Sequence, residues 1–164
     1  MSDFTDRLDR AIARGSRQKQ ASEQQQQAAE LSRDQARDQH GATRLQLTER
    51  IEMVLKALAD RFPGFEYEGV YGVDGWGGAI YRNDIAIDRG ARSSRDLYSR
   101  LQIHVTPLGE QPPYLVEIVG KGTVRNRELL NRRHFERIDE SDEQPFLDKV
   151  DLWAIEFAEQ YSAG

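Results

Sequence analysis

Residues 97–106 read LYSRLQIHVT, and this stretch decides the fold class of the 164-residue chain. Two kinds of side chain alternate along it, with Leu97, Ser99, Leu101, Ile103 and Val105 on one face and Tyr98, Arg100, Gln102, His104 and Thr106 on the other. A period of two predicts a β-strand that buries its apolar face. The polar face of this strand should meet solvent or a ligand.

Further strand-like segments lie on both sides of this stretch. We expect strands over residues 65–73, 79–87, 114–119 and 123–130, and a short edge piece over residues 133–138. Glycine-rich segments at 74–78 and 120–122 predict turns between them. Because no helix-length segment separates the strands, parallel crossovers are excluded. The four to five strands should therefore form an antiparallel sheet.

Two amphipathic helices frame the predicted sheet. Over residues 44–61 the apolar side chains recur every three or four positions, as Leu47, Ile51, Val54, Leu58 and Phe62. Thr43 and Gln46 match a capping box at the start of this helix, and Pro63-Gly64 ends it. A second helix is expected over residues 145–161, with one face formed by Phe146, Val150, Trp153, Phe157 and Tyr161. The predicted fold class is α+β, with both helices on one face of the sheet.

The first 42 residues differ in composition from the rest of the chain. They are rich in Gln, Arg, Asp and Ala and hold few large apolar side chains. Such a segment cannot bury enough apolar surface to offset the entropy of ordering it. Its residue types nevertheless favour helix, and proline is absent before Pro63. We expect a polar extension over residues 1–42, as an exposed or partly disordered helix, and a single α+β domain over residues 43–164.

Composition and charge exclude several classes of protein. The absence of cysteine rules out disulfides, cysteine-ligated metals and thiol nucleophiles. The net charge of −5 makes the chain acidic, which disfavours nucleic acid as a partner. No segment has the roughly 20 apolar residues that span a bilayer, or the apolar core of a signal peptide. We therefore expect a cytoplasmic protein with no membrane partner.

Local motifs for catalysis or metal binding are absent from the sequence. The histidines, His40, His104 and His134, are too far apart along the chain to form such a motif, so we predict no metal and no cofactor. The nucleophile motif of the α/β-hydrolases does not occur either. An enzyme is therefore our third hypothesis. It would place His104, Tyr98, Arg100 and Glu117 in a pocket between the sheet and the helices.

Several arginines fall in or beside the predicted strands. If the sheet gathers them, they would form an anion-binding face for phosphate, nucleic acid or an acidic peptide. The candidate ligand-binding residues are Arg89, Arg92, Arg95, Arg100, His104, Arg125 and Arg127. This anionic-ligand module is our second hypothesis. Ion pairing with the acidic C-terminal helix is the simpler explanation of the same arginines.

Our first hypothesis is a non-catalytic interaction or assembly protein. The extension can form a helix but has no core of its own, which favours docking on a protein partner or self-association, for example as a homodimer. The candidate partner-binding residues are Leu8, Ile12, Leu31 and Trp76. Trp76 is included because a large aromatic residue in a glycine-rich turn should either be packed or anchor a partner.

Overall fold

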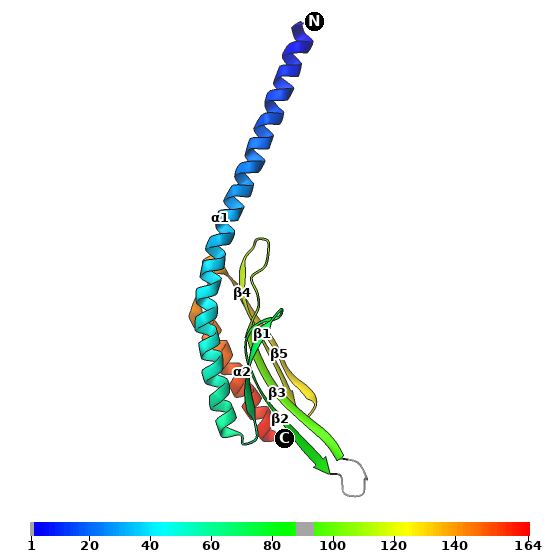
Figure 1. The fold of residues 1–164 in the computed structure, drawn as a ribbon, viewed down its shortest axis with the longest axis vertical. Helices are drawn as coiled ribbons and strands as arrows, with labels where there is room; N and C mark the ends of the chain where they lie inside the picture. The colour runs from blue at the N-terminus through cyan, green and yellow to red at the C-terminus, as the bar shows by residue number, and fades with distance from the viewer. Residues whose placement is uncertain (1, 88–93) are drawn as a thin grey trace. The chain divides into compact units, whose positions relative to one another are not determined.

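The computed structural model describes residues 2–87 and 94–164 (Figure 1). The elements follow in the order α1 (Ser2–Arg61), β1 (Glu66–Gly72), β2 (Gly75–Ile87), β3 (Ser94–Val105), β4 (Leu115–Val124), β5 (Arg127–Arg137), the 3-10 helix η1 (Ile138–Glu140) and α2 (Glu143–Ala163). The chain divides into two compact units, Met1–Asp38 and Gln39–Gly164. The sheet, α2 and the last part of α1 all belong to the second unit.

One five-stranded antiparallel sheet carries the strands in the order β1-β2-β3-β4-β5. The central strand β3 is the one that the alternation of residues 97–106 predicts. Its Leu101 stands opposite Ile80 of β2 and Gly122 of β4. Leu101, Ile103 and Val105 are fully buried, so the predicted core face of the strand is confirmed. The α+β class with an antiparallel sheet is confirmed as well.

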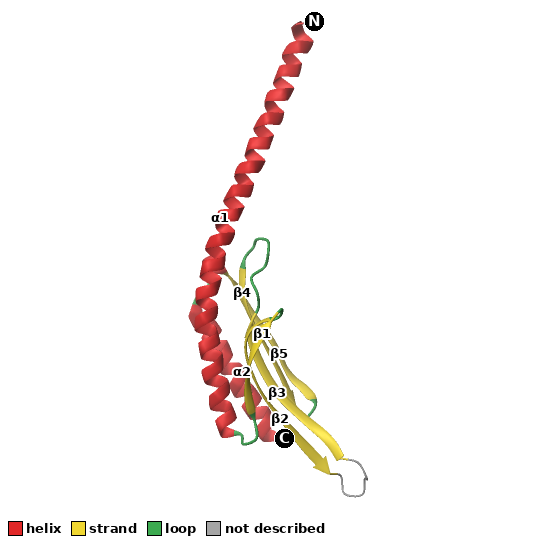
Figure 2. Cartoon of the chain, in the orientation of Figure 1, coloured by secondary structure: helices red, strands yellow, loops and turns green. Residues whose placement is uncertain are grey.

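Helices cover one face of this sheet in the second unit. Residues 39–61 of α1 and the whole of α2 lie on the same side of the strands and run parallel to each other (Figure 2). They run parallel because an odd number of antiparallel strands separates them in the chain. The largest buried side chains that they contribute to the core are Leu47, Ile51 and Leu55 from α1 and Phe146, Trp153 and Phe157 from α2.

Polar contacts fix the ends and the pairing of these helices. The side chain of Asp142 caps α2 by accepting a hydrogen bond from the backbone N–H of Gln144, at 3.3 Å. Arg50 of α1 donates two hydrogen bonds to the carboxylate of Asp151 in α2, at 3.0 and 2.5 Å. This two-pronged ion pair joins the two helices.

The predicted turn at residues 120–122 is wrong, because β4 continues through it to Val124. The turn lies at Arg125 and Asn126, both of which have a positive φ. Gly120 and Gly122 serve packing instead. A Cβ on Gly120 would lie 2.6 Å from Cε3 of Trp153, a distance that real contacts do not reach. These glycines allow the aromatic side chains of α2 to lie directly on the strand.

The first hairpin also turns at a different place from the one predicted. The tight turn is Val73–Asp74, between Gly72 and Gly75, which face each other in the ladder. Gly75 has a φ of +135°, and a Cβ there would overlap the carbonyl oxygen of Val105. The glycine-rich segment is therefore mostly strand, and Trp76 lies within β2 rather than at the tip.

The predicted helix start at Thr43 is wrong, since α1 runs without interruption from Ser2 to Arg61. Residues 1–42 supply helix-favouring side chains and no proline, so nothing stops the helix before Pro63. Gly41 lies inside the helix as well. The capping-box pattern of Thr43 and Gln46 therefore marks no helix end. In the described part of the chain, none of the helices has the length and apolar content that crossing a membrane requires.

Candidate functional site

The polar face of the sheet carries a chain of hydrogen bonds along β3. Arg100 donates to Glu68 of β1 at 2.6 Å and to the side-chain oxygen of Gln102 at 3.0 Å. The amide nitrogen of Gln102 lies 3.2 Å from Nδ1 of His104, and it donates there when the ring carries its proton on Nε2. Burial lowers the pKa of His104. The row is therefore hydrogen-bonded within the sheet, and burial favours the neutral form of its imidazole.

The side chain of Tyr98 also interacts with Arg100, and the charge of Glu117 acts on His104, so the residues of the enzyme hypothesis are neighbours on the sheet. The carboxylate of Glu117 lies 3.7 Å from Arg133 of β5. The backbone N–H of Tyr98 donates to the side chain of Asn126 at 2.8 Å. Among the residues that the structure describes, no hydrogen bond joins His104 to Glu117 or Tyr98, and no group of three acidic or histidine side chains could hold a metal.

The candidate anion-binding arginines occupy different parts of the molecule. Arg100 is paired with Glu68 on the polar sheet face. Arg125 stacks on the ring of Tyr161 at 4.6 Å and donates to the carbonyl of that residue near the end of α2. Arg127 is exposed at the start of β5, and Arg95 belongs to β3. Arg89 and Arg92 lie outside the described residues. The anion-binding face stays a prediction.

The N-terminal unit presents an exposed apolar stripe. Phe4, Leu8 and Ile12 are 65%, 47% and 61% exposed. At about 100° per residue they share a sector of about 80° on the helix. Leu8 and Ile12 are predicted partner-binding residues, and Phe4 extends them by the same spacing of four. Leu31, another of the predicted partner-binding residues, also lies in α1.

A row of arginines lies beside this stripe. Arg7, Arg10, Arg14 and Arg17 line a shallow hollow of about 330 Å³ along the helix. Residues 10–22 carry four basic and no acidic side chains. The helix therefore has an apolar face and an adjacent cationic face, which is typical of a helix that docks on a partner.

Trp76 borders an aromatic groove between α1 and the first hairpin. This aromatic groove, of about 430 Å³, has Tyr67, Tyr71 and Trp76 among its walls. Cationic side chains of the same chain already lie against two of these rings. The guanidinium of Arg44 lies 4.3 Å from the centre of the Trp76 ring, and Lys56 lies 5.1 Å from that of Tyr67. Trp76 is half-buried and contacts Arg44, and its role in partner binding stays a prediction.

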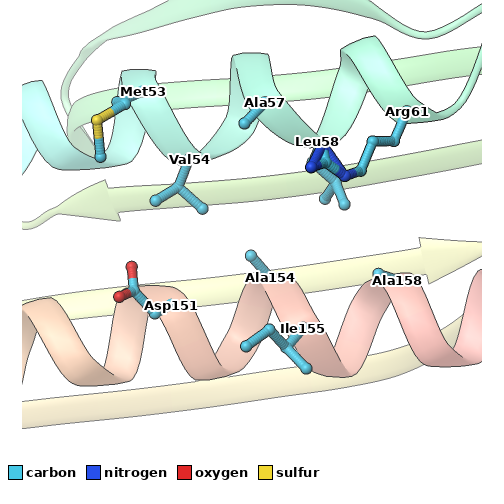
Figure 3. Close-up of a pocket in the computed structure, with 9 residues that line it drawn as sticks. All are labelled: Met53, Val54, Ala57, Leu58, Arg61, Asp151, Ala154, Ile155 and Ala158. Carbon is cyan, nitrogen blue, oxygen red and sulfur yellow. The ribbon is translucent and has the colours of Figure 1, made fainter.

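A second groove runs along the outer side of α1 and α2, opposite the sheet (Figure 3). This helical groove measures about 560 Å³ and is lined almost entirely by apolar side chains. Met53, Val54, Ala57 and Leu58 come from α1, and Ala154, Ile155 and Ala158 come from α2, with Asp151 and Arg61 at opposite ends. Sequence reasoning missed it, although Met53, Ala57 and Ala158 supply small or apolar side chains off the main core stripes.

Comparison with known proteins adds no relative: no family model, no curated protein and no solved structure matches the chain. The function is therefore inferred from the surfaces of the chain itself. Of these, the stripe of Phe4, Leu8 and Ile12 and the helical groove each bring several exposed apolar side chains together.

Proposed function

We propose that the chain is a non-catalytic interaction or assembly protein, whose N-terminal helical segment docks on a protein partner or on a second copy. The single observation that carries this proposal is the exposure of that segment. Residues 3–27 are exposed at every position, including the apolar stripe of Phe4, Leu8 and Ile12. The cytoplasmic location and the protein class of partner expected from the sequence belong to the same proposal.

Helix thermodynamics supports docking. Helical segments in water gain most of their stability from packing an apolar face, because nucleation is costly and propensity is weak. Burying a Leu, Ile or Phe side chain contributes about 1.5–3 kcal/mol relative to leaving it exposed. A partner that covers the three-residue stripe would therefore stabilise the helix and gain affinity from the same contacts.

Charge supports a partner with an acidic surface. The four basic side chains of residues 10–22 lie on a chain whose overall net charge is −5. Complementary charge at the rim of an interface accelerates association and fixes orientation, while the apolar contacts supply most of the affinity. The proposal therefore combines an apolar anchor with a cationic rim.

The test compares the full-length chain with a variant that carries Leu8→Glu and Ile12→Glu. Gln24→Glu is the matched control, since it adds a carboxylate to the same exposed helix outside both the stripe and the basic segment of residues 10–22. Light scattering gives the solution mass, and affinity capture with quantitative mass spectrometry gives the partners. We expect the double variant to lose mass or partners and the control to keep both. If all three chains have the same mass and the same partners, the proposal is refuted.

A further inference from the structure

The helical groove has the shape of a receptor for a helix. Its walls are two parallel helices, and Ala57, Ala154 and Ala158 leave room between them for a third backbone. Large apolar side chains of its lining remain open, with Met53 55% and Ile155 56% exposed. An amphipathic helix that packs into such a groove uses anchors at a spacing of three or four residues.

The apolar stripe of the N-terminal unit has the matching length. Met53 and Arg61, which mark the ends of the groove on α1, are eight residues apart, or about 12 Å along a helix. Phe4 and Ile12 are also eight residues apart, so the stripe spans about 12 Å as well. One helix can thus place all three anchors within the groove.

The charges around the groove favour one direction of the docked helix. At the Met53 end, α2 presents Asp148 beside Asp151, which is paired with Arg50, while Arg61 stands at the other end. The docking helix is acidic at its start, with Asp3 and Asp6, and basic after Ile12. An antiparallel arrangement places its basic part near the aspartates of α2 and its acidic start near Arg61. In this arrangement the dipole of the docked helix is also antiparallel to the dipoles of α1 and α2, which is favourable.

The net charges of α2 and of the N-terminal helix are complementary. α2 carries five acidic side chains against Lys149 alone, a net charge of −4, and two of the five, Asp151 and Glu156, already pair with Arg50 and Arg132. Residues 10–22 carry a net charge of +4. The aromatic groove is the less suitable receptor, because Arg44 and Lys56 already lie on its rings and would repel the arginines.

We infer that the partner of the N-terminal helix is a second copy of this chain, whose helical groove receives Phe4, Leu8 and Ile12 antiparallel to α1 and α2. This inference rests on the proposed function, and it identifies the partner that the proposed function leaves unspecified. Each copy carries both halves of the contact, so two copies that exchange helices bury two stripes and two grooves.

The experiment uses full-length chains with complementary defects. The stripe variant carries Leu8→Glu and Ile12→Glu, and the groove variant carries Met53→Lys and Ile155→Lys, all at exposed positions. Sedimentation over a range of concentrations should show self-association of the unchanged chain, weakened at least about tenfold in each variant. The controls are Gln24→Glu for the stripe and Leu45→Lys for the groove. Leu45 is exposed on α1 outside the helical groove.

Mixing the two defective variants gives the decisive result. One intact stripe and one intact groove are then present on different chains, so the mixture should associate although neither variant does so alone. Because the chain has no cysteine, Phe4→Cys and Ala158→Cys chains can also be mixed and oxidised, and they should form a disulfide. A disulfide with Met53→Cys in place of Ala158→Cys would contradict the antiparallel direction.

The failures of the inference and of the proposed function are distinguishable. If the stripe variant loses association but the groove variant keeps it, the groove is not the receptor, and the docking function stands. If the unchanged chain is monomeric but the stripe variant loses partners in affinity capture, the partner is another protein and the inference is overturned. If neither readout changes, both are refuted.

Discussion

The two parts of α1 form one helix from very different sequences. Residues 39–61 place Leu47, Ile51 and Leu55 in the core, where they are fully buried. Residues 3–27 are exposed at every position. Propensity accounts for the helix in the first part, whereas packing against the sheet and α2 supports it in the second. The comparison shows that element type and element stability are separate properties of a sequence.

Ion pairs differ between the two parts in the same way. Arg50 in the second part holds Asp151 of α2 through two hydrogen bonds, 101 residues away in sequence. In the first part, Arg37 and Asp34 are 3.9 Å apart and both side chains are about two-thirds exposed. An exposed pair within one helix contributes little. The second part therefore has a long-range ion pair in addition to a local one between Lys56 and Glu52, whereas the Arg37–Asp34 pair is local.

Truncating a buried side chain should give the largest difference between the two parts. Ile51→Ala removes a fully buried side chain and should lower the free energy of unfolding of the domain by about 2–5 kcal/mol. Leu8→Ala in the exposed part should change it by less than about 0.5 kcal/mol. Urea unfolding of dilute protein, followed by tryptophan fluorescence, measures both. Equal losses for the two variants would contradict the comparison.

A smaller loss should follow from crowding the core at β4. Gly120→Ala places a methyl group 2.6 Å from the Trp153 ring and should cost about 1–3 kcal/mol of stability. Gly109→Ala is the control, because the nearest atom to its new methyl group is 3.9 Å away. The same urea titration reads out both variants. A Gly120→Ala protein as stable as the control would show that the glycine is not required by the packing of α2.

Substituting alanine for one glycine in each part of α1 gives a more sensitive comparison of the two parts. Gly15 and Gly41 each have open space where a Cβ would be. Gly41→Ala should raise the free energy of unfolding of the domain by about 0.5–1 kcal/mol. Gly15→Ala should raise the helical circular dichroism signal and leave the unfolding midpoint unchanged. If Gly15→Ala shifted the midpoint as much as Gly41→Ala, the two parts would be one cooperative unit.

A decrease in pH should destabilise the domain that contains the second part of α1, and it should leave the first part unaffected. Burial lowers the pKa of His40 and of His104, and residues 2–38 contain no histidine. Below a pH of about 6.5 the unfolded chain binds protons that these folded imidazoles resist, so stability should fall as the pH decreases. Thermal unfolding at pH 7.5 and 5.5 measures this, with His104→Gln showing the smaller decrease in Tm. An equal decrease in both proteins would remove His104 from the explanation.

Local patterns in the sequence were sufficient for the class of the fold. The alternation of residues 97–106 and the helical spacing after Leu47 each reflect burial along one element, and both are confirmed. The turn at Gly120 was predicted wrongly because a strand glycine and a turn glycine give the same signal. Only the position of Trp153, which comes 33 residues later in the chain, distinguishes them.

The candidate surfaces were predictable only in part. Leu8 and Ile12 stood out because no local core explains them; both side chains are exposed, and their role in partner binding stays a prediction. The helical groove depends on two helices that meet side by side from opposite ends of the domain sequence, so no local pattern reveals it. That Ala57 and Ala158 line a groove can be recognised only once the pairing of the two helices is known.

Hydrogen exchange along α1, measured at a low and a high protein concentration, tests the central claim most directly. Amides of residues 44–61 should be strongly protected at both concentrations, because only unfolding of the domain exposes them. Amides of residues 4–15 should exchange quickly in dilute protein and gain protection as the concentration rises and the helix docks. Equal protection along the whole helix, or fast exchange of residues 4–15 at both concentrations, would contradict the account.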